Sequence, residues 1–279
     1  MIAYRPLDVP PDLRPYVRRI VHADHEAPIT AEVRPAPTGY SYIGWVYRGT
    51  VGAKDATPPN AKLQDGPHVA GQITSDDITV RYDGRLGHLL AECTATGLTE
   101  LTGIAGADCV NQASSLRHLA PFAALDAPYS DPPAQRFVAA LSGQAAAPFS
   151  VPGWIKEAAT LIEQAGGQIK ITDLAGSLAI SQRQLERGFK NVVGLSPKFF
   201  ARVQQLNLAF TAMQQDDTAT LAALAVEAGF YDQAHFNNAM RAFLGTSPLA
   251  YLRSPDDLFS TFLGRSDAFR ALVQKQAAP

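Results

Sequence analysis

Hydrophobic and polar residues follow one pattern before residue 150 and another pattern after it. Before residue 150, short runs rich in β-branched and aromatic residues stand between turn residues. The clearest runs are 40–47, 78–82 and 88–93. Asp83 and Gly84 separate the last two runs and predict a turn there. Short strands with this spacing are typical of sandwiches and barrels, and a helix is predicted to follow them over 132–141.

After residue 150 the hydrophobic residues recur with the period of an α-helix. A first apolar face is formed by Trp154, Ile155, Ala158, Ala159 and Ile162. A second stripe predicts one long helix and consists of Phe199, Val203, Leu206, Phe210 and Met213. The two patterns predict an α+β protein. Its expected parts are a β-rich barrel or sandwich domain over 1–143, a linker over 144–153, an all-α domain over 154–253 and a helical tail over 254–279.

The all-α half contains an internal repeat. Leu174-Ala175 recurs 50 residues later as Leu224-Ala225. With an offset of 51 residues, Leu185, Phe189, Gly194 and Ser196-Pro197 recur as Phe236, Met240, Gly245 and Ser247-Pro248. Each copy predicts a short helix, a tight turn and a longer helix that ends at the glycine. The residues expected to cap these helices are Thr172, Ser181, Thr220 and Asp232.

A short helix, a tight turn and a longer helix make a helix-turn-helix, whose second helix can lie in the major groove of DNA. The same spacing also suits two ordinary helical hairpins in a bundle, because a fold alone does not set a function. Charge favours DNA binding for the first copy, since residues 181–202 carry five basic residues and one acid, a balance of +4. The second copy, residues 229–253, has a balance of +1 and offers mostly amides and a histidine.

These residues resemble the DNA-binding domain of the AraC/XylS family of bacterial transcription regulators. The likeness spans about residues 151–253 and is carried by LAVEAGFYDQAHFNNAMRAFLGTSPLAYLR and by the similar first copy, LAGSLAISQRQLERGFKNVVGLSPKFFARV. It implies a seven-helix domain in which a linker helix, about 199–214, lets two recognition helices enter successive major grooves. The DNA-contacting residues expected are Gln182, Arg183, Glu186, Arg187 and Lys190 in the first copy, and Gln233, His235, Asn237, Asn238 and Arg241 in the second.

Three positions depart from the pattern of that family. The family commonly has arginine where this chain has Gln205 and Asn238, and phenylalanine where it has Met240. Met240 is still expected to pack in the core. Asparagine at position 238 removes an expected phosphate or base contact, so the second copy is predicted to bind DNA more weakly than the first.

The first half has a fainter resemblance to the β-rich, cupin-like N-terminal domain of some AraC-type regulators. Residues 11–17, 37–40 and 69–72 carry this likeness. It implies a domain that senses a ligand or mediates pairing. The candidates for an effector pocket are Tyr40, Tyr42, Trp45 and Tyr47. The same aromatic residues also fit the core and the face of an ordinary strand.

The amino-acid composition excludes several classes of protein. The 279 residues are 46% hydrophobic and 18% charged, which suits globular domains rather than a disordered chain. A formal net charge of −2 excludes a histone-like coat but allows a local basic patch. Two cysteines, Cys93 and Cys109, cannot build a four-cysteine zinc cluster or a disulfide-dense scaffold. The sequence shows no secretory leader and no apolar run of about 18 residues, so a soluble, cytoplasmic protein is expected.

A catalytic or metal-binding first half is the competing interpretation. The side chains that could ligate a metal are His22, Asp24, His25, Glu26, His68, His88 and Cys93. Two histidines three residues apart would need further ligands from elsewhere, and a solvated surface cluster is the preferred interpretation of residues 22–26. Ser114-Ser115 lacks a nucleophile-elbow pattern, and no glycine-rich phosphate loop occurs. No catalytic residue, metal site or cofactor is therefore expected.

The sequence thus predicts a sequence-specific DNA-binding transcription regulator, not an enzyme, that responds to an effector through its first half. The alternative is a small-molecule-binding or catalytic β-domain protein whose helical half no longer binds DNA specifically. The candidate partners are double-stranded DNA, a small-molecule effector, RNA polymerase and a second copy of the chain in a homodimer. No membrane partner is expected. The effector, the operator, the sign of regulation and the oligomeric state stay open.

Overall fold

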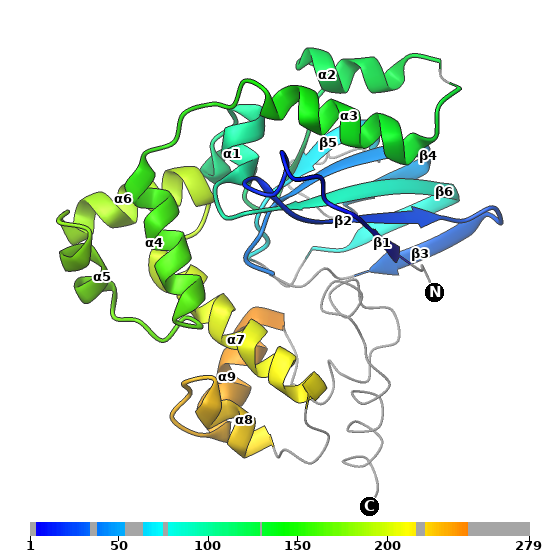
Figure 1. Cartoon of the computed structure of the whole chain (residues 1–279). Coiled ribbons are helices and arrows are strands. Elements are labelled where there is room, and N and C mark those ends of the chain that lie inside the picture. The colour runs from blue at the N-terminus through cyan, green and yellow to red at the C-terminus, as the bar shows by residue number, and fades with distance from the viewer. Residues whose placement is uncertain are drawn as a thin grey trace, which may run out of the picture.

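The computed structural model describes residues 4–33, 38–53, 64–74, 78–128, 130–215 and 221–244. Its first part is a seven-stranded antiparallel sheet accompanied by short helices, and its second part is helical (Figure 1). The predicted order of a β-rich domain followed by an all-α region with two helix-turn-helix motifs is confirmed.

The seven strands pair in the order β1-β2-β6-β4-β5-β7, and β3 pairs with β6 beside this path. Their bounds are β1 Tyr4–Leu7, β2 Val17–Asp24, β3 Ile29–Val33, β4 Tyr42–Ala53, β5 Gln64–Ala70, β6 Val80–Cys93 and β7 Ala113–Ser115. Because β6 pairs with β2, β3 and β4, it is the central strand of the domain.

Strand β6 runs through the position where the sequence predicts a turn. Residues 80–82 of the first predicted run and the whole second run, 88–93, belong to this one strand, so the turn expected at Asp83 and Gly84 is wrong. Gly84 has a φ of 89°, and Gly49 on the paired strand β4 has a φ of 77°. The pairing of β4 with β6 shifts between Arg48 and Thr50. The glycines therefore form an irregularity within the ladder instead of ending the strand.

Short helices cover one face of the sheet. They are α1 Gly97–Thr102, α2 Ala120–Ala123 and α3 Pro133–Ala145, with the 3₁₀-helices η1 Gly106–Cys109 and η2 Ala124–Asp126. Figure 1 shows α2 and α3 lying over the sheet. Beneath them, Trp45 and Leu89 of the sheet share one buried core with Phe122 and Phe137 of these helices. Helix α3 extends four residues beyond the predicted 132–141.

The described residues of the helical part form six further helices. They are α4 Gly153–Gln164, α5 Ile171–Ser177, α6 Gln182–Val193, α7 Pro197–Gln215, α8 Leu221–Glu227 and α9 Gln233–Leu244. The apolar face predicted for 154–162 is buried, because Ile155, Ala158 and Ile162 lie in one core with Leu185 and Phe189. The predicted tail, 254–279, lies outside the described residues.

Three of the predicted helix ends are observed. Ser181 caps α6 by accepting a hydrogen bond from the Gln184 amide, and Asp232 Oδ1 accepts one from the His235 amide at the start of α9. Gly194 ends α6 with a φ of 87°. The cap expected at Thr172 is wrong, because Lys170 precedes α5 and Thr172 lies inside the helix. Thr220, Gly245 and Ser247-Pro248 lie outside the described residues.

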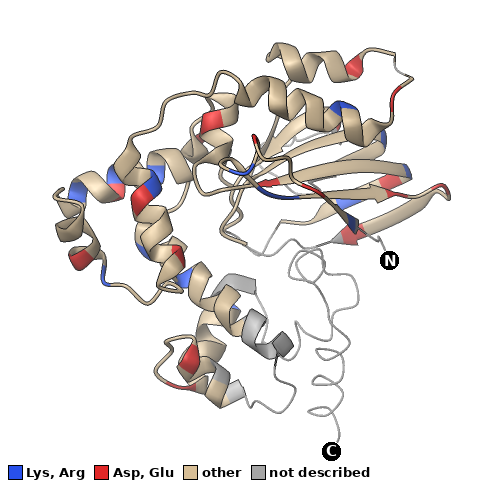
Figure 2. Cartoon of the chain, in the orientation of Figure 1, with Lys and Arg blue, Asp and Glu red and all other residues tan. Residues whose placement is uncertain are grey.

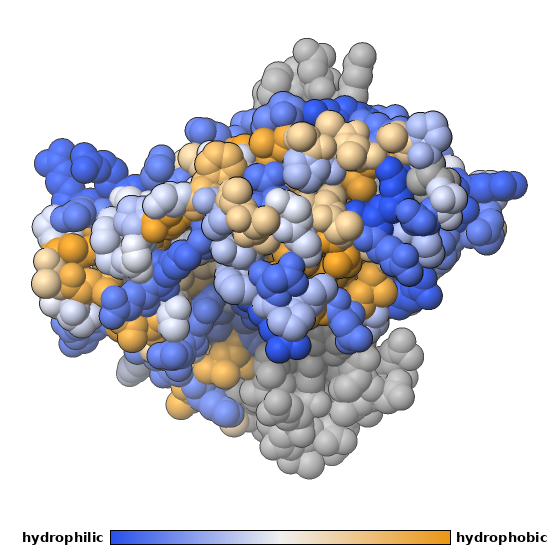
Figure 3. Space-filling view, turned by 45° about the horizontal axis from the view of Figure 1, so that its top comes forward, coloured by the Kyte–Doolittle hydropathy of each residue, from blue (hydrophilic) through white to orange (hydrophobic). Residues whose placement is uncertain are grey.

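The surface of this fold is mixed in character. On the face turned toward the viewer in Figure 3, hydrophobic residues are interspersed with hydrophilic ones. No helix in the described ranges combines the length and the apolar character needed to cross a bilayer.

Candidate DNA-binding surface

Helix α6 is the predicted recognition helix of the first copy, and its two sides differ in chemistry. Leu185 and Phe189 are fully buried, as the repeat predicts for both residues. Arg183, Arg187 and Lys190 are exposed, and their spacing of four and three residues places them on one face. Figure 2 shows basic residues in blue on the first helices of the helical part. Among the described residues, no ion-pair partner neutralises these three side chains. Their charges are therefore available to DNA phosphates or guanine edges.

The remaining predicted contacts on α6 bind each other. The Gln182 side-chain amide donates to Glu186 Oε1 over 2.8 Å, one helical turn away. This hydrogen bond engages one oxygen of Glu186, the one acidic residue on the helix. Neither Arg183 nor Arg187 forms an ion pair with Glu186 among the described residues.

Helix α9 is the predicted recognition helix of the second copy. Phe236 and Met240 are fully buried, so methionine replaces the usual phenylalanine without leaving the core. Gln233, Asn238 and Arg241 are exposed. This face can donate and accept hydrogen bonds but carries one positive charge, that of Arg241. The weaker DNA contact expected from the sequence stays a prediction.

His235 and Asn237, also predicted to contact DNA, are half-buried. The His235 ring lies between two donors, with Nδ1 3.3 Å from the Tyr231 amide nitrogen and Nε2 3.3 Å from Arg202 Nη2. A neutral imidazole has one lone-pair nitrogen, so it accepts from only one of these groups at a time. Either contact turns the ring toward the protein, and the sequence could not predict a partner 33 residues away.

Two residues outside the predicted set also belong to this surface. The guanidinium carbon of Arg202 lies 5.2 Å from the centre of the Phe230 ring, so this arginine joins the linker helix α7 to the second motif. Tyr231 is 88% exposed in the turn just before α9. The sequence signal for Tyr231 was an aromatic residue beside the Asp232 cap, at the helix end that approaches DNA in such motifs.

The second motif is also fastened to the loop after α4. The Gln168 side-chain amide donates to the carbonyl of Glu227 over 3.0 Å. Gly229 makes this approach feasible, because a Cβ atom there would lie 2.7 Å from Gln168 Cγ. The turn of the second motif therefore packs against the first half of the helical domain.

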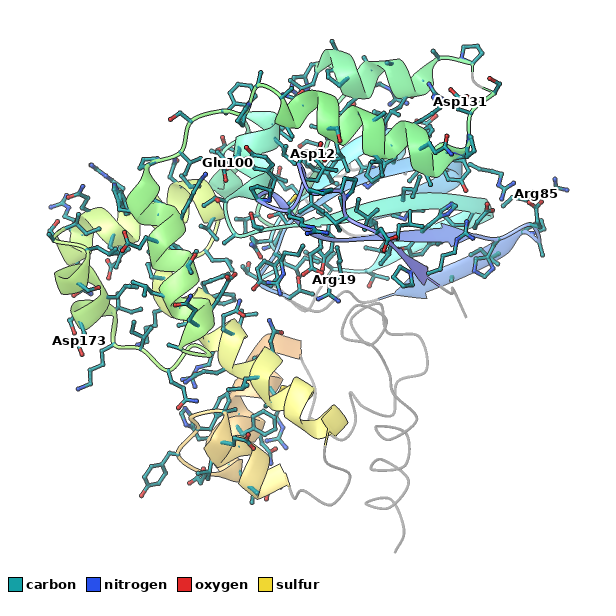
Figure 4. All side chains as sticks on the ribbon, viewed as in Figure 1. Asp12, Arg19, Arg85, Glu100, Asp131 and Asp173 are labelled. Carbon is teal, nitrogen blue, oxygen red and sulfur yellow. The ribbon has the colours of Figure 1, made fainter. Side chains whose placement is uncertain are left out.

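The β domain contacts the end of the first recognition helix. The Thr99 hydroxyl donates to the carbonyl of Val192 over 2.9 Å, and Gly106 packs against the backbone at the end of α6. Lys156 on α4 forms an ion pair of 2.5 Å with Glu100 on α1. Figure 4 shows Glu100 where the β domain meets the helical part. These contacts fix the first motif to the β domain.

A cavity of about 250 Å³ lies between the sheet and helices α4 and α7. Its lining residues are Arg18, Arg19, Thr38, Tyr40, Glu92, Glu163, Gly166, Gln204, Asn207 and Leu208. Figure 4 shows Arg19 on the side of the sheet that faces α7. The sequence signal for this site was a charged residue, Glu92, inside the apolar run 88–93.

The charges in this cavity are paired across the two domains. Buried Glu92 lies 2.9 Å from Arg19 Nε and 3.4 Å from Arg18 Nε. Burial raises the pKa of Glu92, and the two arginines lower it. On the helical side, Glu163 Oε1 accepts a hydrogen bond of 2.8 Å from the Tyr40 hydroxyl and lies 3.8 Å from Arg18 Nη1. Burial raises the pKa of Glu163 as well, against the effect of Arg18.

The structure separates the four aromatic residues predicted to form an effector pocket. Tyr40 lines the cavity, and the Tyr42 hydroxyl donates to Thr38 Oγ1 on its rim. Trp45 and Tyr47 belong instead to the core under the helices, with ring centroids 5.3 Å apart.

The side chains of residues 22–26 are held by neighbours. His22 contacts Arg5 over 3.0 Å and the Tyr47 hydroxyl over 2.7 Å, and Arg48 pairs with Asp24 and Glu26. Cys93 and Cys109 are buried free thiols, and burial raises the pKa of Cys109 to about 11. Such thiols are poor nucleophiles at neutral pH.

Comparison with known proteins agrees with the geometry of the helical part. Residues 174–254 match the family model of a helix-turn-helix domain. No curated protein matches the chain. The resemblance of the helical part to the DNA-binding domain of AraC-type regulators is confirmed over the matched range, as a helix-turn-helix domain.

Two solved structures illustrate the similarity. An AraC-type transcriptional regulator from Chromobacterium violaceum is 27% identical over 34% of this chain and 86% of its own, with a TM-score of 0.32. ToxT from Vibrio cholerae is 11% identical over 90% of this chain and 98% of its own, with a TM-score of 0.47.

Proposed function

We propose that this chain is a sequence-specific transcription regulator whose helices α6 and α9 enter successive major grooves of one DNA duplex. The main support is the row of exposed cations on α6, which lie opposite the buried Leu185 and Phe189 and have no ion-pair partner in the described part of the chain. A guanidinium group can read guanine through two hydrogen bonds or clamp a phosphate. Helix α9 adds uncharged contacts through Gln233 and Asn238. The proposed function is binding, without a bond-making step.

Replacing Arg183 and Arg187 together by alanine tests this function. Each good arginine contact contributes about 1–3 kcal/mol, so loss of two contacts should lower the specific affinity by about 30-fold or more. Contact with about four to six phosphates predicts a slope of log K against log salt of about −4 to −5, and the double variant should flatten it by about 2. Fluorescence anisotropy with an operator selected from genomic DNA measures both quantities.

The matched control removes two arginines from the β domain. Arg14 and Arg85 are exposed, and Figure 4 shows Arg85 at the end of the sheet far from the helical part. The R14A/R85A variant should retain the parent's affinity and salt slope. If the R183A/R187A variant binds the operator as tightly as the parent, α6 does not read DNA.

The cavity between the domains is the proposed effector site. Arg18 and Arg19 each have five N–H donors, of which Glu92 and Glu163 engage only some. The Gln204 side-chain nitrogen is buried and finds no hydrogen-bond partner among the residues that the structure describes. A small molecule with a carboxylate or a similar acceptor group would satisfy these donors. By competing for Arg18, it would loosen the link between the sheet and α4.

Melting temperatures measured with a panel of small carboxylates, each beside its uncharged amide, test this site. An effector should raise the melting temperature as the carboxylate but not as the amide. The R18Q variant should lose this response. Arg117 has a similarly exposed side chain, at 42% against 35% for Arg18, so R117Q is the control that should keep it. An R18Q variant that responds like the parent would refute the assignment.

A second function rests on the weak DNA face of α9, where His235 and Asn237 are half-buried. In this alternative the β domain binds a small molecule and the helical part has no specific DNA site. A genome-wide binding selection at low salt separates the two functions. An enriched motif supports the regulator, and its absence supports the alternative.

A further inference from the structure

The cavity between the sheet and helices α4 and α7 contains charges of both signs. Two arginines, Arg18 and Arg19, and two glutamates, Glu92 and Glu163, belong to its described lining. Their formal charges cancel when all four are ionised. A ligand with a single negative charge would leave this partly buried site with an excess charge, which is unfavourable away from water. A ligand with one charge of each sign would leave the site neutral.

Arg18 offers hydrogen-bond donors to the negative end of such a ligand. Its guanidinium carbon lies 3.6 Å from the centre of the Tyr40 ring, so stacking holds the plane of the group. Its Nε atom lies 3.4 Å from Glu92, and its Nη1 atom lies 3.8 Å from Glu163. Both distances exceed the length of a charge-assisted hydrogen bond, about 2.7–2.9 Å. The N–H groups of Arg18 can therefore bind a carboxylate that comes closer.

Glu163 offers an acceptor to the positive end. Its Oε1 atom accepts a hydrogen bond of 2.8 Å from the Tyr40 hydroxyl. Within the described ranges, its other oxygen, Oε2, has neither a hydrogen bond nor an ion pair. Burial raises the pKa of Glu163, and Arg18 opposes this effect without cancelling it. The carboxylate is therefore not fully compensated, and an ammonium group at Oε2 would stabilise its ionised form.

An α-amino acid matches the separation of these two groups. Standard bond lengths place its ammonium nitrogen about 2.5 Å from its carboxylate carbon. Arg18 Nη1 and Glu163 Oε1 are 3.8 Å apart. The carboxylate of the ligand can thus face the guanidinium while its ammonium group faces the glutamate. A carboxylic acid without an amino group would leave the charge of Glu163 uncompensated.

The rest of the lining limits the size and the character of the ligand. The volume of about 250 Å³ corresponds to roughly eight water molecules. Among the described lining residues, Leu208 is the one aliphatic side chain, and Thr38, Gln204 and Asn207 add polar groups. This lining suits a small amino acid with a short side chain and gives a long acyl chain little apolar surface.

We propose that the effector is a small free α-amino acid, bound as its zwitterion by Arg18 through the carboxylate and by Glu163 through the ammonium group. This inference rests on the effector site proposed above and names its ligand class. Arg18 belongs to β2 and Glu163 belongs to α4, so the ligand lies between the two domains. It replaces the direct contact between these residues, as the proposed function requires.

Melting temperatures of the full chain, measured with each of the twenty standard amino acids, test this ligand class. At least one amino acid should raise the melting temperature. Its N-acetyl derivative keeps the carboxylate but loses the ammonium group and should have no effect. Its amide keeps only the ammonium group and should also have no effect. The comparison uses the parent chain alone, so it does not depend on the folding of a variant.

Calorimetry with the responding amino acid tests the two residues separately. The variants R18Q and E163Q should each weaken binding at least about 10-fold, because each loses a contact between opposite charges. The control for the glutamate is E157Q, which changes an exposed residue on the same helix. The control for the arginine is R117Q, whose arginine pairs with Asp65 and Asp126 outside the cavity lining. Both controls should bind the amino acid like the parent.

The possible outcomes separate this inference from the function on which it rests. If the N-acetyl derivative raises the melting temperature as much as the amino acid, the cavity is still the effector site but the ligand class is wrong. The same conclusion follows if E163Q binds the amino acid like the parent, or if simple carboxylates bind and no amino acid does. If neither amino acids nor carboxylates bind, both the ligand class and the effector site are overturned.

Discussion

At the residue scale, one turn residue in each helix-turn-helix has a positive φ. Ala179 has a φ of 53° in the first motif, and Gly229 has a φ of 81° at the equivalent position of the second. The left-handed region costs a residue with a Cβ atom about 1–2 kcal/mol, whereas glycine adopts it readily. The first motif therefore folds with local strain that the second motif avoids.

Replacing Ala179 by glycine should stabilise the protein. Relief of the left-handed strain exceeds the extra flexibility of glycine in the unfolded chain, so the free energy of unfolding should rise by about 0.5 kcal/mol. Ala179 is exposed, so no core packing is lost. Urea unfolding measures the change. The reverse substitution, G229A, is the comparison, and it should destabilise because its Cβ would meet Gln168. A less stable A179G variant would contradict this account.

Single residues also show which contacts can be predicted from the sequence and which cannot. The caps at Ser181 and Asp232 follow from local sequence, because the capping side chain and its amide partner are three residues apart. Thr172 has the right chemistry for a cap, but the helix begins one residue earlier. The position of His235 depends on Arg202, which only the folded chain brings near.

At the scale of elements, the two recognition helices are supported differently. Helix α6 is held by the β domain through Thr99 and by the core around Phe189. Helix α9 contacts α7 through Arg202, whose guanidinium lies beside both Phe230 and His235. Arg202 is therefore a positioning residue for the second motif.

Replacing Arg202 by methionine should weaken DNA binding at one half-site. Methionine keeps much of the apolar contact with Phe230 but loses the charge and the contact with His235. Footprinting should show weaker protection of the half-site read by α9, while the half-site read by α6 stays protected. Lys198 is an exposed cation on the same helix, so K198M is the control for loss of charge. Equal loss at both half-sites in R202M would mean that Arg202 acts only through its charge.

The elements themselves were largely predictable, and their exceptions have physical causes. The helices of the second half could be predicted because the sequence repeats. The pairs Leu185–Phe189 and Phe236–Met240 occupy the same positions in the two copies, and both pairs are buried. Strand β6 was not predicted as one element, since Asp83 and Gly84 are turn residues in most contexts. Here Gly49 on the paired strand β4 also has a positive φ, and the pairing of the two strands shifts beside it. The strand therefore continues through Asp83 and Gly84.

At the scale of the whole molecule, polar contacts join the domains. The Tyr40 hydroxyl reaches Glu163 on α4, and the Asn207 side-chain amide on α7 donates to the Thr38 carbonyl over 3.0 Å. The sequence could not predict this cavity, because its residues come from both halves of the chain. Polar interfaces of this kind can rearrange more readily than apolar ones. The contacts can thus transmit a change at the cavity to the linker helix.

Glu163 makes this interface sensitive to pH, and the E163Q variant tests how. Burial raises its pKa above the ordinary value of 4.5. A carboxyl group whose pKa is higher in the folded than in the unfolded protein stabilises the fold while it is protonated. This stability is fully present at pH values below the unfolded-state pKa, and it is lost as the pH rises through the folded-state pKa. Glutamine mimics the protonated form and still accepts from Tyr40. E163Q should therefore match the parent near pH 4 and exceed its unfolding free energy near pH 7, by less than about 1 kcal/mol because the side chain is 35% exposed. Urea unfolding at both pH values measures this difference. The control is E157Q, which changes an exposed glutamate on the same helix. If the difference between E163Q and the parent shrinks as the pH rises, ionised Glu163 stabilises the interface.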